Sequence, residues 1–399
     1  MVDHLTLCGL ERTGSHEASG FSLIQHGEIV FQNTDSWLDT IRTVLRYGFW
    51  SLTKLEYFVS HLLEHFAKIY PALDSGHGFN TVEDVLDAMS PVSKNGTNSK
   101  EMQKMTKLSI TEKLEQIGIS PELIDELATI ATKVNYGQFP ENLHSFVGAV
   151  SLAGIQGGLW RVMGGNYKIP QCLLEKSKGE LISGTVQSID YLQNEKRVEI
   201  SYTVPGQNSS KEMFDIGVVA FPLTKDKSTV KLNGIQAKGF PGSFQRTLAY
   251  IVHGALNKAA IGLTSDWSET DNFFFTDHKE VIASISLLTP VDFDPASQAE
   301  IPSVYKIFSR SNLSKKDIGK YFTEIYSYEI VDWLAYPDYS SFPGLGEVRL
   351  EENLYYLNSI EWAASAMEMS ALSAKNIANL IAQSQGLKPK ETSSSKSEL

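Results

Sequence analysis

The sequence is poor in cysteine and in basic residues. Cys8 and Cys172 are the only two cysteines among 399 residues. Two thiols cannot build a disulfide framework or a four-thiolate metal site, although they can pair with each other or remain buried and free. Lysine and arginine number 35 against 47 for aspartate and glutamate, which gives a formal net charge of −12. A field of that sign repels phosphate backbones, so we expect no nucleic-acid partner.

Long apolar runs are also missing. No stretch reaches the roughly 18 apolar residues of a membrane-spanning helix, and residues 1–4 resemble no secretory signal. We therefore expect no transmembrane segment and no export of the chain as printed. Three triplets that begin at Asn95, Asn208 and Asn312 nevertheless have the form that is glycosylated in the secretory lumen. Hydrophobic residues make up 42% of the sequence, which is typical of an ordinary globular protein.

The spacing of apolar residues predicts a helical block at residues 36–133. An alternating hairpin around Gly27 precedes this block, and Thr81 and Ser120 are suited to cap helices within it. Two runs have the three-to-four spacing of a helix with one buried face. Their apolar residues are Trp37, Leu38, Ile41, Val44 and Leu45, then Leu55, Phe58, Val59, Leu62, Phe66 and Ile69.

Strand patterns dominate the second half of the sequence. Residues 184–192 and 197–204 predict a hairpin, and the continuous apolar run at 215–222 predicts a strand buried on both faces. Antiparallel candidates follow at 246–256, 273–288 and 303–309, and a buried strand at 354–357. Ser365 and Glu368 then have the spacing of a capping box for a helix that ends near Ile381. The tail from Gly386 is polar and is expected to be disordered.

One short motif matches a zinc-peptidase pattern. Residues 61–65 read His-Leu-Leu-Glu-His, which places two imidazoles one helical turn apart beside a carboxylate. His61, Glu64 and His65 lie opposite the apolar stripe of the same predicted helix. We therefore expect a solvated helix face and no metal site.

Two glycine-rich or small-residue segments allow close approach to a ligand. The dinucleotide-binding pattern G-x-G-x-x-G is absent, but Gly164, Gly165 and Asn166 form a turn whose glycines permit a backbone to approach a planar ligand. The last predicted helix is rich in alanine and serine. The small side chains can allow tight packing of this helix on a sheet. Alternatively, its first amides, at residues 366–368, can point at a cofactor. From pattern alone, both interpretations of each segment stay open.

Several longer segments carry a family resemblance. The sequence resembles the prenylcysteine oxidases, and in details such as Gly242-Ser243-Phe244-Gln245 the prenylcysteine oxidase-like branch. The segments are Arg46 to Phe49, Val134 to Gln138, Phe146 to Leu152, Leu159-Trp160, Gly164 to Asn166, Trp333 to Pro337 and Leu354 to Ala371.

The resemblance implies a flavoprotein of the amine oxidase type. It implies FAD on a Rossmann-like α/β domain and an α+β substrate domain made of an antiparallel sheet and helices. Family members oxidise the thioether carbon of farnesyl- or geranylgeranyl-cysteine with molecular oxygen, which gives cysteine, a prenyl aldehyde and hydrogen peroxide. No catalytic residue is implied. The implied cofactor-binding residues are Trp160, Gly164, Gly165, Asn166, Val186, Asn358, Ala366, Met367 and Glu368.

The resemblance also implies substrate contacts and a division of the chain. Aromatic candidates for the isoprenoid are Trp37, Phe49, Trp50, Phe273, Phe274, Trp333 and Trp362, most of which we expect in the core. Substrate-domain segments are expected at 1–35, 36–145 and 226–340, FAD-domain segments at 146–225 and 341–385, and a disordered tail at 386–399. Family members are glycoproteins of the lysosome or are secreted.

The sequence departs from the family pattern at two places. It begins after the expected first strand, glycine-rich turn and helix, and Met163 replaces a glutamate before the glycine pair. We therefore expect an amino-terminally shortened chain with an incomplete Rossmann-like fold. The alternative function is a non-catalytic prenyl- or lipid-binding protein that has lost FAD.

Overall fold

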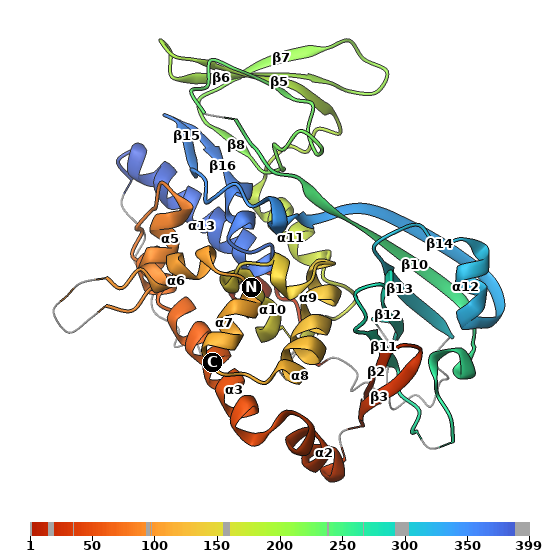
Figure 1. The fold of residues 1–399 in the computed structure, drawn as a ribbon. Coiled ribbons are helices and arrows are strands. Elements are labelled where there is room, and N and C mark those ends of the chain that lie inside the picture. The colour runs from red at the N-terminus through yellow and green to blue at the C-terminus, as the bar shows by residue number, and fades with distance from the viewer. Residues whose placement is uncertain are drawn as a thin grey trace. The chain divides into compact units, whose positions relative to one another are not determined.

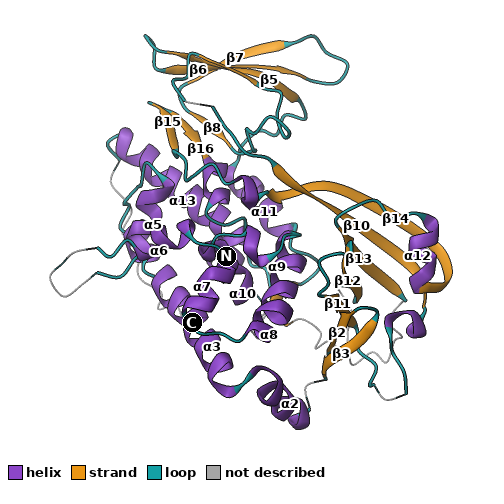
Figure 2. Cartoon of the chain, viewed as in Figure 1, coloured by secondary structure: helices purple, strands orange, loops and turns teal. Residues whose placement is uncertain are grey.

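The structure is a computed structural model that combines helices and strands (Figures 1 and 2). It describes residues 2–14, 20–34, 36–92, 96, 98–154, 160–237, 239–265, 267–291 and 303–387. The chain divides into two compact units. Unit 1 comprises Met1–Val59, Ser109–Gly179 and Gln245–Tyr336, and unit 2 comprises Ser60–Leu108, Glu180–Phe244 and Pro337–Leu399. Each unit is thus built from segments that lie far apart in the sequence.

A seven-stranded sheet forms the centre of unit 1. Its strand order is β14-β10-β13-β12-β11-β2-β3, and only the β11–β2 pairing among the registered ones is parallel. The antiparallel strands and the hairpin predicted from the sequence are therefore confirmed. The bounds are β2 Phe21–Gln25, β3 Glu28–Asn33, β10 Phe244–Leu256, β11 Asn272–Phe275, β12 Ile282–Leu287, β13 Val304–Ser309 and β14 Phe322–Pro337.

The sheet buries one apolar cluster, in which Tyr250, Phe273 and Ile307 are almost fully inaccessible. The alternation of inward and outward residues along β10 matches the period of two that the sequence predicts. Five helices of unit 1 fall wholly or largely within the predicted helical block. They are α2 Trp37–Tyr47, α3 Phe49–Phe66, which runs on into unit 2, α7 Ile110–Gln116, α8 Pro121–Leu123 and α9 Thr129–Tyr136. The helices outside the block are α1 Val2–Cys8, α10 Ser145–Ala153, α11 Lys168–Ser177 and α12 Lys315–Tyr321.

Local cap chemistry follows the sequence. The Ser120 hydroxyl accepts a hydrogen bond from the Leu123 amide, and Pro121 occupies the first position of α8. A short π-helix, Ile124–Ala128, continues α8 into α9. Gly148 lets α10 approach α7, because a Cβ at this position would lie 2.4 Å from Ile110 Cβ. These contacts fix the helices of unit 1 to one another.

Cys8 and Cys172 form a disulfide bond, a pairing that the sequence left open. The bond joins α1 to α11 across 164 residues of sequence. Beside it, β1 (Arg12–Gly14) pairs antiparallel with β4 (Trp160–Val162), and Leu5 packs with Val162 and Ile169. The disulfide therefore closes a small layer that has its own apolar centre.

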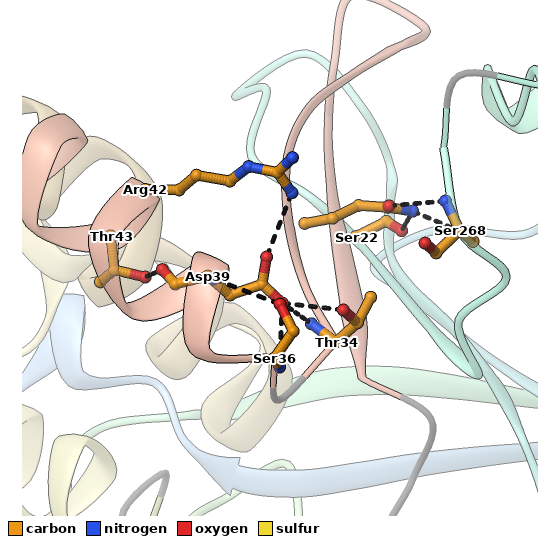
Figure 3. Close-up of polar contacts among 8 residues, drawn as sticks. Ser22, Thr34, Ser36, Asp39, Arg42, Thr43 and Ser268 are labelled. Carbon is orange, nitrogen blue, oxygen red and sulfur yellow. Dashed lines mark hydrogen bonds and ion pairs between the residues drawn. The ribbon is translucent and has the colours of Figure 1, made fainter.

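The prediction that the apolar face of α2 is buried is wrong. Trp37, Ile41 and Leu45 are 73%, 48% and 80% exposed, whereas Asp39 is buried. Figure 3 shows the cause: Asp39 Oδ2 accepts hydrogen bonds from the Thr34 amide and hydroxyl at 2.6 and 2.8 Å. Burial alone would raise the pKa of Asp39, but hydrogen bonds from Thr34 and Ser36 outweigh it and lower the pKa to about 2. This anchor turns the polar face of α2 inward.

Unit 2 contains two smaller sheets that share an apolar cluster. In the first sheet, with order β15-β16-β8, β16 and β8 are parallel; the second has the order β7-β6-β5-β9. Val198, Leu354 and Tyr356 lie in the shared cluster. The bounds are β5 Thr185–Leu192, β6 Arg197–Thr203, β7 Ser210–Phe214, β8 Gly217–Val219, β9 Lys231–Asn233, β15 Arg349–Glu351 and β16 Leu354–Tyr356.

Two strand predictions in unit 2 have different outcomes. The β5–β6 hairpin and the buried strand β16 are confirmed. The run at 215–222 yields only the three residues of β8, at the edge of its sheet, with Val218 45% exposed. Complete burial of this strand is therefore a wrong prediction, since one of its faces is open.

The helices of unit 2 pack in a series, in which α4 contacts α13 and α5 contacts both α4 and α6. They are α4 Ile69–Asp74, α5 Val82–Met89, α6 Glu101–Lys104 and α13 Met367–Ser384. Thr81 caps α5 as predicted. Asn376 of α13 accepts a hydrogen bond from the Phe79 amide and donates one to the Phe79 carbonyl. None of the helices in the described parts of the chain is long and apolar enough to cross a bilayer.

Candidate functional site

The segment that joins β16 to α13 in unit 2 contains buried polar atoms without a partner. A 3₁₀ helix, Leu357–Trp362, makes this connection. Within the described residues, Asn358 Oδ1 and Glu361 Oε2 are buried and accept no hydrogen bond. Burial raises the pKa of Glu361, although a hydrogen bond from Asn358 and the charge of Lys227 act in the opposite direction. Unsatisfied buried groups cost free energy unless a ligand or water satisfies them.

The predicted capping box of α13 is wrong. The helix begins at Met367, and its cap residue is Ala366, whose side chain has no hydrogen-bond acceptor. The Glu368 carboxylate accepts a hydrogen bond from the Tyr70 hydroxyl at 2.7 Å. Met367 is 58% exposed. The side chain of the cap residue therefore satisfies none of the first-turn amides of α13.

Tyr339 fixes the approach to α13. Its hydroxyl donates to the Glu361 carbonyl at 2.8 Å and accepts from the Ser365 amide at 3.1 Å. Trp362 is buried beneath it, and a Cβ on Gly242 would lie 2.4 Å from the indole. Sequence reasoning missed Tyr70, Tyr339 and Glu361, because their partners are set by the tertiary fold.

Val186 and Asn358 belong to the same unit. Val186 lies on β5 opposite Tyr202 of β6, and its side chain packs against the cluster that contains Leu354 and Tyr356. Asn358 follows Tyr356 directly along the chain. Five of the predicted cofactor residues are therefore in unit 2: Val186, Asn358, Ala366, Met367 and Glu368.

The other four predicted residues are in unit 1: Trp160 lies on β4, and Gly164, Gly165 and Asn166 lie in the turn between β4 and α11. Gly164 and Gly165 have φ values of 76° and 114°, and a Cβ on Gly165 would lie 2.9 Å from the Tyr167 ring. Asn166 Oδ1 accepts a hydrogen bond from the Val162 amide at 2.9 Å, and Trp160 packs beside the disulfide layer. The turn needs these glycines for its backbone. Their predicted contact with a cofactor stays a prediction.

Unit 1 also contains a buried lysine. Lys133 is 1% exposed, and its Nζ donates to the carbonyls of Phe275 and Asp277 at 2.5 and 3.2 Å. Burial, with the charge of Arg310 in second place, lowers the pKa of Lys133 to about 8. Phe139 lies against both cations and stacks on His278. The lysine is thus bound by two backbone carbonyls, and the charges of Glu280 and Asp277 also act on it.

The aromatic residues proposed for the isoprenoid have different surroundings. Phe273 and Trp362 are buried in the core, as expected. Trp37, Phe49, Trp50 and Trp333 are 58–73% exposed, so a core role for them is wrong. Their contact with a substrate is not tested by this distribution.

The helix face of His61, Glu64 and His65 is only partly solvated. Glu64 is exposed, but His65 is 5% exposed, which contradicts the expected solvated face. Burial lowers the pKa of His65, with smaller contributions from His61 and Lys68. Elsewhere in unit 2, a shallow cavity of about 470 Å³ is lined by residues that include Phe79, Asp84, Asp87 and Asn98. None of the predicted cofactor residues lines it.

Comparison with solved structures identifies the type of fold. A variant of putrescine oxidase has a TM-score of 0.56 at 10% identity, and the alignment covers 96% of this chain and 85% of that chain. Cyclohexylamine oxidase from Brevibacterium oxydans has a TM-score of 0.56 at 12% identity, with 96% and 84% covered. The mixed α and β architecture expected from the resemblance is confirmed at this level, while its Rossmann-like details stay a prediction.

Comparison of sequences gives a narrower relationship. Prenylcysteine oxidase 1-like of Mus musculus is 32% identical over 394 residues, which cover 95% of this chain and 77% of that protein. Prenylcysteine oxidase 1 of Homo sapiens is 34% identical over 381 residues, with 91% and 73% covered. The model of the prenylcysteine lyase family matches residues 30–392. The chain therefore belongs to the prenylcysteine lyase family.

Proposed function

We propose that this protein is an FAD-dependent oxidase that cleaves the thioether of farnesyl- or geranylgeranyl-cysteine. Membership of the prenylcysteine lyase family and the likeness of its fold to two amine oxidases support this activity. The structural observation that carries the proposal is the segment that leads into α13, where Asn358 Oδ1 and Glu361 Oε2 are buried without a partner and the cap residue Ala366 makes no side-chain hydrogen bond.

These residues fit a flavin. The amides of Met367 and Glu368 suit a carbonyl edge on which negative charge accumulates, because the start of an 18-residue helix favours such charge. Asn358 and Glu361 add polar atoms that are already desolvated. Val186 is proposed for the adenine contact, and Trp160, Gly164, Gly165 and Asn166 for further contacts to the cofactor.

When bound, FAD accepts the two electrons of thioether oxidation and passes them to molecular oxygen. The residues of the chain then orient the cofactor and exclude water. Glu361 has a raised pKa, so a larger fraction of its carboxyl group carries a proton near neutral pH than for an exposed glutamate. We propose that Glu361 Oε2, which is buried and has no partner, is one of the atoms that contact the cofactor.

Replacement of Met367 by proline tests the helix start. Proline at the first position of a helix removes one amide donor and preserves the helix, and the extended backbone of Ala366 is compatible with a following proline. We expect Met367→Pro to lose flavin during purification, whereas Met367→Ala keeps it. Equal flavin content in both variants would show that the start of α13 does not bind the cofactor.

The activity itself is tested on the purified chain. A yellow, flavin-loaded protein that releases hydrogen peroxide with farnesylcysteine is the expected result. A colourless protein that still binds farnesylcysteine would support the alternative of a non-catalytic prenyl-binding protein. A flavin-loaded protein that is inert with both prenylcysteines would overturn the proposed substrate.

We also propose that the protein matures in an oxidising compartment, either the lysosome or the secretory route. The disulfide between Cys8 and Cys172 supports this, since such bonds are rare in the cytosol. Asn208 and Asn312 are exposed and open to glycosylation, while Asn95 lies outside the described residues. A fall in apparent mass on endoglycosidase treatment of the protein from secretory cells, lost in an Asn208→Gln/Asn312→Gln variant, tests both sites.

A further inference from the structure

We propose that His61, Glu64 and His65 of α3 form a binding site for a divalent transition-metal ion such as Zn²⁺. Each residue offers one ligand atom, and these atoms all lie within 4.8 Å of one another. The two imidazole rings are 4.1 Å apart between centroids. Zinc bonds to imidazole and carboxylate are about 2.0–2.2 Å long, so small side-chain rotations bring all three ligands onto one ion.

The hydrogen bond of His65 prepares this residue as a ligand. His65 Nδ1 lies 3.0 Å from the carbonyl oxygen of His61, one turn earlier in the helix. A carbonyl can only accept, so Nδ1 carries the hydrogen and Nε2 keeps its lone pair. Metal-binding histidines commonly use such a bond to fix their tautomer and ring orientation. Burial of His65 restricts the ring further.

A second element supplies a fourth oxygen. Glu101, the first residue of α6, places its Oε1 3.7 Å from His61 Nε2. Both residues belong to unit 2, and both side chains are about one-third exposed. A metal ion bound by His61, Glu64, His65 and Glu101 would have two nitrogen and two oxygen ligands. The ion would then connect α3 to α6.

The ligand set predicts which ion binds. Imidazole nitrogen favours zinc, copper and nickel, whereas magnesium and calcium prefer oxygen ligands alone. Lys68 lies just beyond the end of α3, where it precedes α4, is exposed, and acts electrostatically on His65. Its positive charge opposes a bound cation. Lys68→Ala is therefore expected to tighten zinc binding.

Calorimetric titration tests the proposal on the whole chain, without a polyhistidine tag and after dialysis against a chelator. We expect one Zn²⁺ per chain with micromolar affinity and no detectable binding of Mg²⁺. His61→Ala and Glu64→Gln change partly or fully exposed side chains, so the fold should persist. Each is expected to weaken zinc binding, His61→Ala by about tenfold or more. His253→Ala, which alters an exposed histidine of unit 1, is the matched control.

Glu101→Gln separates the two parts of the proposal. If the ion connects α3 to α6, zinc raises the melting temperature of the wild type more than that of Glu101→Gln. An equal rise in the melting temperature of both proteins would show that only residues of α3 bind the ion, and would overturn the proposed connection to α6. Absence of zinc binding to the wild type, or unchanged affinity in His61→Ala, would overturn the site itself.

Discussion

Glu126 binds both arms of the Arg46 guanidinium. Arg46 Nε donates to Glu126 Oε2 at 2.7 Å, and Nη2 donates to Oε1 at 2.5 Å. The Tyr47 hydroxyl adds a third hydrogen bond to Oε2. The carboxylate lies in the π-helix Ile124–Ala128, so it fixes the end of α2 to the helices that follow. Burial, followed by the bond to Glu126, raises the pKa of Tyr47.

Loss of this carboxylate should destabilise the protein. Glu126→Gln leaves the Arg46 guanidinium without a counter-charge, and removal of one partner of a buried pair costs roughly 3–5 kcal/mol. Arg46 is about one-third exposed, so we expect about 2–3 kcal/mol less free energy of unfolding in urea. The exposed Glu122 provides the control, since Glu122→Gln should stay within about 0.5 kcal/mol. Equal stability of the two variants would contradict the role of Glu126.

Lys133 should make stability depend on pH in the alkaline range. Its pKa is about 8 in the folded state and 10.5 as the ordinary value. Between these values the unfolded chain holds a proton that the folded chain has released, so the free energy of unfolding rises with pH. The shift lowers the free energy of unfolding by about 3 kcal/mol below pH 8, and this destabilisation is absent above pH 10.5.

Comparison with Lys133→Met isolates this contribution from tyrosines that titrate nearby. As pH rises from 8 to 10.5, the free energy of unfolding of the wild type should increase relative to that of Lys133→Met. Urea unfolding at several pH values measures it. A difference that is independent of pH would show that Lys133 keeps an ordinary pKa in the folded protein.

Short-range chemistry explains what the sequence predicts well. Thr81 and Ser120 cap helices through amides three residues away, so their signals lie within one turn of sequence. The β5–β6 hairpin follows from alternation around a polar turn. Family resemblance assigns Val186 and Asn358 to the cofactor, a role that spacing alone does not indicate and that stays a prediction.

Long-range contacts explain what the sequence does not predict. Glu368 has the correct spacing for a capping box, but its carboxylate binds Tyr70, 298 residues away in the sequence. Tyr339 likewise reaches Ser365 through the tertiary fold. An amphipathic pattern also fails to specify which face is inside: in α2 the hydrogen bonds of Asp39 decide it.

The orientation of α2 can be tested with matched leucines. Leu45 is 80% exposed, whereas Leu114 of α7 is fully buried. Leu114→Ala creates a cavity and should cost about 2–5 kcal/mol of unfolding free energy. Leu45→Ala removes little buried surface and should change the free energy of unfolding by less than about 0.5 kcal/mol. A large loss for Leu45→Ala in urea unfolding would mean that another surface covers α2 in solution.

Reduction of the disulfide should weaken unit 1. A bond between Cys8 and Cys172 restricts the unfolded chain over 164 residues, and native disulfides commonly contribute about 2–4 kcal/mol. We expect dithiothreitol to lower the guanidinium midpoint of the wild type. The double variant Cys8→Ser/Cys172→Ser should unfold at the lower midpoint with or without the reductant, because it has no bond to lose. The same reductant effect on both proteins would show that the thiols are unpaired in the folded protein.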